Sequence, residues 1–174
     1  MEAERHSGSQ NGHSSPADAP AAPEAANPPI VHVLMIDDAK AIVVMVQQGL
    51  AQIGGYRVTC AFDGEEGLKR FYDEPPDCVV VDVMMPKLDG YQFVRCLRAD
   101  KSARQMPLVM ATALTTPTNV KVGYLSGADL YLTKPYTARG LHEAIQRVMA
   151  LSPEERERRM ELLANGGNIP DPQT

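Results

Sequence analysis

Short apolar runs and helix-patterned segments alternate five times along residues 30–150, and this alternation constrains the fold more than any other feature. Five runs are apolar enough for buried strands and too short for helices. They cover residues 30–36, 56–61, 78–83, 107–111 and 128–133. Continuous hydrophobic strands of this kind are typical of a parallel sheet that helices cover on both faces. The sequence therefore predicts an α/β fold with a doubly wound, five-stranded parallel sheet.

The segments between these runs carry helix start and stop signals. Asp63 and Thr137 precede helical patterns and are the predicted N-caps of the second and last helices. A short helix is expected over residues 120–125. The first helix is predicted from apolar residues at helical spacing, Ile42, Val46, Leu50 and Ile53, and we expect it to end at Gly54-Gly55.

The two ends of the chain differ from this middle domain. Residues 1–29 contain five prolines, seven alanines and no aromatic residue, which predicts a disordered tail. A docking segment that folds on a partner is the alternative, and no feature supports it. Residues 151–174 open with a Ser-Pro-Glu-Glu capping pattern, which predicts a short charged helix over 153–164 and then a flexible tail. We interpret this helix as a solvated appendage or an extension of the preceding helix, with a partner-binding helix as the alternative.

Composition excludes several classes of protein. The formal net charge is −5, and residues 30–150 hold 13 acidic and 13 basic residues with no basic stripe, so a nucleic-acid platform is not expected. No apolar run reaches the roughly 18 residues of a membrane span. Three cysteines without metal-ligand spacing favour a reducing, cytoplasmic location. No glycine-rich motif of a dinucleotide enzyme or a P-loop ATPase occurs.

Polar residues stand where four of the predicted strands end. In a doubly wound sheet the carboxyl ends of the strands form the ligand-binding edge. The residues that the sequence puts there are Asp37, Asp38, Asp82, Thr112 and Lys134. Carboxylate oxygens suit Mg²⁺, and a lysine can pair with a phosphoryl group, so the set favours phosphoryl transfer to a carboxylate. Asp37 and Asp38 taken alone are also compatible with helix caps, whereas an acid inside the apolar strand 78–83 is costly to bury without a partner.

As a set, these residues resemble the receiver domain of bacterial two-component response regulators, over residues 30–150. The matching stretches are LMIDD at 34–38, VDVMMPKLDG at 81–90, ATA at 111–113 and ADLYLTKP at 128–135. The resemblance implies a flavodoxin-like fold of five βα units. It also implies a phosphorylation-activated signalling switch. About 24 residues follow this domain, too few for a DNA-binding output domain, so we expect a stand-alone regulator that signals through another protein.

The resemblance assigns a role to each site residue. Asp82 is the expected phosphoacceptor for a histidine kinase or a histidine phosphotransfer protein. Asp38, Asp82 and the backbone carbonyl of Met84 are expected to hold Mg²⁺, with Asp37 acting largely through a bound water. Lys134 and Thr112 are expected to contact the phosphoryl oxygens.

The resemblance also predicts how the signal leaves the site. Tyr131 is at the aromatic switch position and is expected to turn inward as Thr112 moves. The peptide bond between Lys134 and Pro135 is expected to be cis. The output face is made by the fourth helix, fifth strand and fifth helix, and a homodimer through that face is compatible with the sequence.

The resemblance places two apolar residues beside the path of an attacking water. Met84 lies two residues after Asp82, and Leu114 lies two residues after Thr112. We therefore predict slow self-dephosphorylation, whereas the small Ala113 keeps the site open to phosphodonors.

Two other readings compete with the receiver. A phosphatase with an aspartate nucleophile needs a general acid two residues after that nucleophile, where this chain has Met84. A pseudo-receiver that no longer takes phosphate is disfavoured because all five site residues are present.

Overall fold

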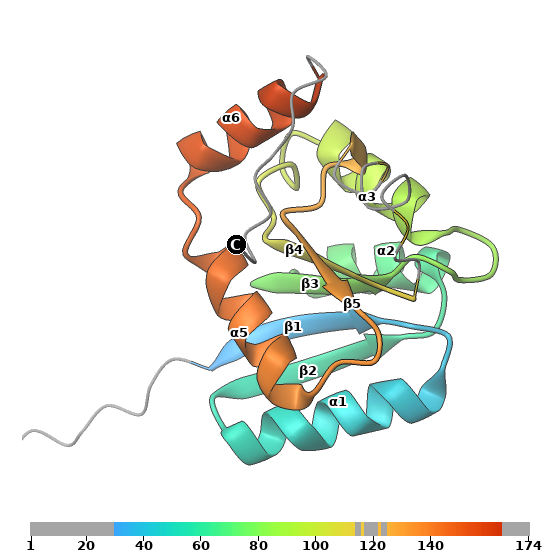
Figure 1. Ribbon diagram of the computed structural model, residues 1–174. Helices are drawn as coiled ribbons and strands as arrows, with labels where there is room; N and C mark the ends of the chain where they lie inside the picture. Colours follow the sequence, from blue (N-terminus) through green and yellow to red (C-terminus); the bar gives the residue numbers. More distant parts are fainter. Residues whose placement is uncertain (1–29, 114–115, 117–121, 123–124, 165–174) are drawn as a thin grey trace, which may run out of the picture.

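The computed structural model describes residues 30–164 except 114–115, 117–121 and 123–124. Among the described residues, one parallel sheet of five strands has the order β2-β1-β3-β4-β5 (Figure 1). The strands are β1 (Val31–Ile36), β2 (Tyr56–Ala61), β3 (Cys78–Asp82), β4 (Leu108–Thr112) and β5 (Leu130–Thr133). The predicted doubly wound α/β fold is confirmed.

Helices cover both faces of this sheet (Figure 1). On one face, α1 (Lys40–Ile53) and α5 (Ala138–Met149) pack on a buried cluster that includes Val33, Val80 and Leu141. On the other, α2 (Gly64–Asp73) and α3 (Gly90–Ala99) pack on a cluster that includes Phe71 and Phe93. Successive residues of a strand point to opposite faces, so the continuous apolar runs supply both clusters.

The predicted caps agree with the structure, and the apolar residues of α1 are only partly covered by the sheet. The side chains of Asp63 and Thr137 accept hydrogen bonds from the N–H groups of Glu66 and Gly140, at 2.8 Å and 3.0 Å. Of the apolar residues at helical spacing in α1, Val46 and Leu50 are buried, whereas Ile53 is 43% exposed at the end of the helix. Helical spacing predicts which side of a helix is apolar. How far along the helix that side is buried depends on how it packs against the sheet.

The C-terminal helix α6 (Pro153–Ala164) spans the predicted residues. Ser152 caps it by accepting a hydrogen bond from the Glu155 N–H. Most described side chains of α6 are exposed, as a solvated appendage requires, and the helix is separate from α5 rather than an extension of it. The buried exception is Arg156, with its Nε 3.2 Å from Oδ2 of Asp129. A side-chain partner 27 residues away in the chain leaves no local signal in the sequence.

Some predicted segments fall outside the described residues. They are the tail over 1–29, most of the short helix over 120–125, and the end of the chain from residue 165. The described helices include none with the length and apolar content that crossing a membrane requires.

Candidate functional site

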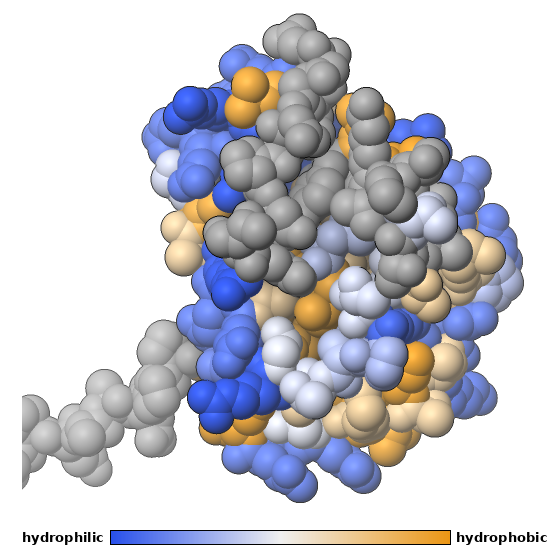
Figure 2. Space-filling view, viewed as in Figure 1, coloured by the Kyte–Doolittle hydropathy of each residue, from blue (hydrophilic) through white to orange (hydrophobic). Residues whose placement is uncertain are grey.

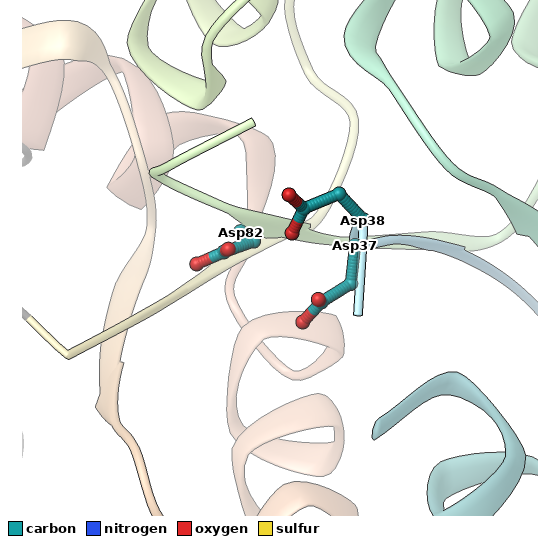
Figure 3. A group of neighbouring side chains, drawn as sticks. All are labelled: Asp37, Asp38 and Asp82. Carbon is teal, nitrogen blue, oxygen red and sulfur yellow. The ribbon is translucent and has the colours of Figure 1, made fainter. Parts of the chain in front are cut away.

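The sheet order brings the predicted site residues to one edge. Asp37 and Asp38 follow β1, and Asp82 ends β3, the strand that pairs with β1. One carboxylate oxygen from each of the three lies within 4.8 Å of the others. Figure 3 shows these side chains gathered where the two strands end. The sequence prediction that three acids from two strands share one site therefore agrees with the geometry.

Lys134 joins this cluster from the end of β5. Its Nζ donates a hydrogen bond to Oδ2 of Asp37 at 2.7 Å and lies 3.1 Å from Oδ1 of Asp82. The lysine backbone is also fixed, because its N–H donates to the Thr112 carbonyl at 2.8 Å. One ammonium group thus faces two carboxylates and balances part of their repulsion.

Asp82 is buried beside the Lys134 ammonium. Its residue is 5% exposed, and its Oδ1 lies 3.1 Å from the Lys134 ammonium. Burial raises the pKa of the Asp82 carboxyl, and the nearby Asp37 adds to this, while the Lys134 ammonium lowers the pKa. A buried carboxylate oxygen with a cation nearby can act as a nucleophile toward an electrophilic group.

Asp37 and Asp38 have different surroundings. Asp37 is fully buried, and its Oδ1 accepts a hydrogen bond from the Ala39 N–H at 2.9 Å. Asp38 is exposed. The alternative that these acids cap α1 is not supported, since the helix has Ala39 at its N-cap and no side-chain cap.

The remaining predicted residues lie around this cluster. Thr112 is buried at the end of β4, Met84 is 63% exposed, and Leu114 lies outside the described residues. The Lys134–Pro135 peptide bond is cis. Tyr131 is 7% exposed and points inward, where its hydroxyl donates to the Tyr91 hydroxyl at 3.1 Å.

Sequence reasoning missed Tyr136. Its hydroxyl is buried without a hydrogen-bond partner in the described structure. Burial raises the pKa of Tyr136, and the carboxylates of Asp37 and Asp82 raise it further. The sequence offered one signal that Tyr136 lies near the site, namely its position directly after Lys134 and Pro135.

The donor set fits a hard divalent cation. Three carboxylates converge, and a single lysine leaves excess negative charge among them. Oxygen ligands of this kind are those that Mg²⁺ prefers, with waters completing its shell.

The sheet order, the acidic cluster and its lysine together define the class of receiver domains. The family model described as the response regulator receiver domain matches residues 33–146, and this chain belongs to that family. One relative is the alkaline phosphatase synthesis transcriptional regulatory protein PhoP of Bacillus subtilis, 38% identical over 120 residues, which are 69% of this chain and 49% of PhoP. Another, a probable transcriptional regulator ycf27 of Guillardia theta, is 40% identical over 67% of this chain and 44% of its own length.

Solved receiver structures are similar over nearly their whole length. The chemotaxis response regulator CheY4 of Vibrio cholerae has a TM-score of 0.64 and 34% identity, covering 68% of this chain and 98% of CheY4. The receiver domain of the sensor histidine kinase PA1611 from Pseudomonas aeruginosa has a TM-score of 0.64 and 26% identity, covering 70% of this chain and 98% of its own, with a magnesium ion in its active-site cleft.

The chain spans about half the length of the transcriptional regulators that it matches. The expectation of a stand-alone regulator without an output domain therefore stays a prediction.

Proposed function

We propose that this chain is a phosphorylation-activated switch of a two-component system or phosphorelay, with Asp82 as the acceptor. The observation that carries the proposal is the position of Asp82. Its carboxylate ends a buried strand beside the carboxylates of Asp37 and Asp38, and the Lys134 ammonium lies 3.1 Å from its Oδ1. Family membership and the solved receivers support the same reading.

The reaction moves a phosphoryl group from a histidine ring nitrogen to an Asp82 oxygen. The nitrogen–phosphorus bond breaks, an oxygen–phosphorus bond forms, and the product is an acyl phosphate. Lys134 would neutralise charge on the phosphoryl oxygens, and Asp37 holds the ammonium for this role through its 2.7 Å hydrogen bond. The hydroxyl of Thr112 would bind the group after transfer.

A bound Mg²⁺ would neutralise charge on the transferring group. The acidic cluster supports Asp38 and Asp82 as its ligands, with the Met84 carbonyl, and Asp37 through a water. The magnesium-bound receiver of PA1611 is a precedent on the same fold.

An apolar hollow beside the site suits a protein phosphodonor. Its volume is about 340 Å³, and its lining includes Ile42, Met45 and Pro135. Figure 2 shows hydrophobic side chains among polar ones where α1 and the loop before α5 meet. A histidine kinase or phosphotransfer protein could cover this hollow while its histidine reaches Asp82, and the three unpaired cysteines fit a cytoplasmic encounter.

The signal would leave through a protein–protein contact made by β5, α5 and the segment between β4 and β5. Adding roughly two negative charges at Asp82 draws Thr112 and Lys134 toward it and shifts an existing equilibrium in that face. A downstream protein or a second copy of the chain would read the change. The chain is proposed as a switch rather than an enzyme, because Met84 stands where an aspartate phosphatase needs its general acid.

Acetyl phosphate with Mg²⁺, followed by intact-mass measurement, tests the acceptor. Wild type should gain one phosphoryl group and Asp82→Asn none, while Asp77→Asn serves as a control at an acid outside the cluster. A gain in both wild type and Asp82→Asn would show that the acceptor is another residue. If acetyl phosphate and a phosphorylated histidine donor both failed on wild type, the pseudo-receiver reading would replace this proposal.

The decay of the same mass gain tests the lifetime. Exposed Met84 offers no polar group to orient a water, so we expect a half-life of minutes to hours. A half-life of a few seconds would contradict this, and Met84→Asn should shorten it.

A further inference from the structure

The inward side chain of Tyr131 has a polar partner on α3. Tyr131 belongs to the buried cluster on the α2 and α3 face, and its hydroxyl donates a hydrogen bond to the Tyr91 hydroxyl at 3.1 Å. Tyr91 is the second residue of α3 and packs against the same cluster. This hydrogen bond therefore connects the inward ring of Tyr131 to the first turn of α3, the helix that follows β3 and Asp82.

Tyr91 is itself held close to the acceptor backbone. The Gly90 N–H donates to the Val83 carbonyl at 3.0 Å. A Cβ at Gly90 would lie 2.2 Å from the Asp82 carbonyl oxygen, so the two backbones meet with no room for a side chain. A displacement of the Asp82 backbone must therefore be shared by the start of α3.

Tyr131, the donor of the hydrogen bond to Tyr91, is also connected to Asp82, through its own strand. Tyr131 lies on β5 three residues before Lys134, whose ammonium is 3.1 Å from Asp82 Oδ1. Asp82 is thus connected to the tyrosine pair by two routes. One runs through the start of α3, and the other runs through Lys134 and β5. Both routes consist of contacts between described residues.

We propose that Tyr91 is a positioning residue of the switch. Its hydroxyl holds Tyr131 inward before a phosphoryl group arrives and so sets how often the unmodified chain visits the inward state. This inference rests on the proposed function for its meaning in signalling. Because one neutral hydrogen bond makes a modest net contribution, its removal should shift the ratio of inward to outward Tyr131 by about fivefold.

Fluorine NMR of the chain labelled with 3-fluorotyrosine measures this ratio. The six tyrosines give six signals, and the signal that is missing from Tyr131→Phe belongs to Tyr131. The solvent isotope shift of that signal between H₂O and D₂O reports how far the ring is exposed. Spectra are recorded on the unmodified chain and after acetyl phosphate treatment, with intact mass measured on each sample.

Tyr91→Phe and Tyr72→Phe form a matched pair. Tyr72 also loses a hydrogen bond, because its hydroxyl donates to Asp100 at 2.7 Å, but that bond links α2 to the end of α3. In the unmodified chain, Tyr91→Phe should increase the isotope shift of the Tyr131 signal, and Tyr72→Phe should leave it at the wild-type value. Both variants should unfold cooperatively.

Three outcomes separate the hypotheses. A Tyr131 signal in Tyr91→Phe with the wild-type isotope shift overturns the inference, and so does an equal change in both variants. A wild-type chain that gains no mass from acetyl phosphate or from a phosphorylated histidine donor contradicts the proposed function. The comparison of unmodified chains still decides the role of Tyr91 in that case.

Discussion

Asp82 has to be ionised to accept a phosphoryl group, yet its burial favours the neutral acid. The residue is 5% exposed, and burial raises the pKa of its carboxyl even with the Lys134 ammonium nearby. A group whose pKa is higher in the folded state than in the unfolded state loses stability as the pH rises through that range. At neutral pH the ionised Asp82 therefore lowers the free energy of unfolding.

Replacing this carboxyl should stabilise the metal-free protein. We expect Asp82→Asn to raise the free energy of unfolding at pH 7 by about 1 kcal/mol, the usual size of one stabilising substitution. The difference from wild type should shrink as the pH falls through the raised pKa of Asp82, because wild type then becomes neutral there too. Urea unfolding in EDTA across a pH series measures this.

The control for Asp82→Asn is Asp73→Asn. Asp73 lies on α2 with a side chain 61% exposed and pairs only with Lys69 in the described structure. Its removal should change the unfolding free energy by less than about 0.5 kcal/mol. A destabilised Asp82→Asn would show that the ion pair with Lys134 outweighs the cost of burial.

The close approach of α3 to the end of β3 requires glycine at position 90. A Cβ on Gly90 would lie 2.2 Å from the Asp82 carbonyl oxygen and 2.9 Å from the Val83 Cα, both backbone atoms that cannot turn aside. Gly90→Ala should lower the free energy of unfolding by about 3 kcal/mol, the upper end of ordinary overpacking. Thermal or urea unfolding measures the change.

Gly140 in α5 provides the matched comparison. A Cβ there meets nothing closer than the Thr137 Oγ1 at 3.5 Å, which is an ordinary contact. Gly140→Ala should raise the unfolding free energy by about 0.5–1 kcal/mol, because alanine loses less backbone entropy in a helix. Equal effects at the two glycines would show that the backbone at Gly90 relaxes away from the added methyl group.

A buried ion cluster attaches helix α6 to the rest of the domain. Oδ2 of Asp129 lies 3.2 Å from both Arg98 Nη2 and Arg156 Nε, and it also accepts the Leu108 N–H at 2.8 Å. Burial raises the pKa of Asp129 despite the two guanidinium groups. Arg156 also donates to the carbonyls of Val148 and Leu151, so this one side chain joins α6 to α5 and to the start of β5.

Removing that attachment should weaken the whole domain. We expect Arg156→Ala to lower the free energy of unfolding by about 3 kcal/mol, because it breaks a buried, hydrogen-bonded charge cluster. Arg158→Ala on the exposed side of the same helix should change it by less than about 0.5 kcal/mol. If urea unfolding gave the same small effect for both, α6 would be the solvated appendage that its sequence suggests.

Strands and caps were predictable because their signals are local. The apolar run that became β2 has the predicted bounds, and Asp63 and Thr137 cap the helices that follow them. Long-range partners were not predictable. Nothing near Arg156 indicates Asp129, and nothing near Tyr91 indicates Tyr131, which is 40 residues away. Such contacts depend on which strands become neighbours.

At the scale of the whole molecule, the sheet order converts scattered polar residues into one site. Strand β1 pairs with β3, so Asp37 and Asp38 lie beside Asp82 although about 45 residues separate them in the chain. Lys134, at the end of β5, joins the same site. This convergence was predictable because parallel strands have their carboxyl ends at one edge. The side-chain environments were not, and the buried Tyr136 hydroxyl is the plainest example.

Binding of a cation at this edge should stabilise the entire domain. A ligand that binds only the folded state raises the free energy of unfolding by RT ln(1 + [L]/Kd), which is about 1.4 kcal/mol at tenfold excess over Kd. We expect MgCl₂ to raise the unfolding midpoint of wild type well beyond the effect of KCl at equal ionic strength. Asp38→Asn is the sharpest variant, because Asp38 is exposed and makes no ion pair in the described structure, so its loss should remove the Mg²⁺ effect and leave the apo fold intact. An equal midpoint shift in wild type and Asp38→Asn would exclude Asp38 as a ligand and place the cation elsewhere.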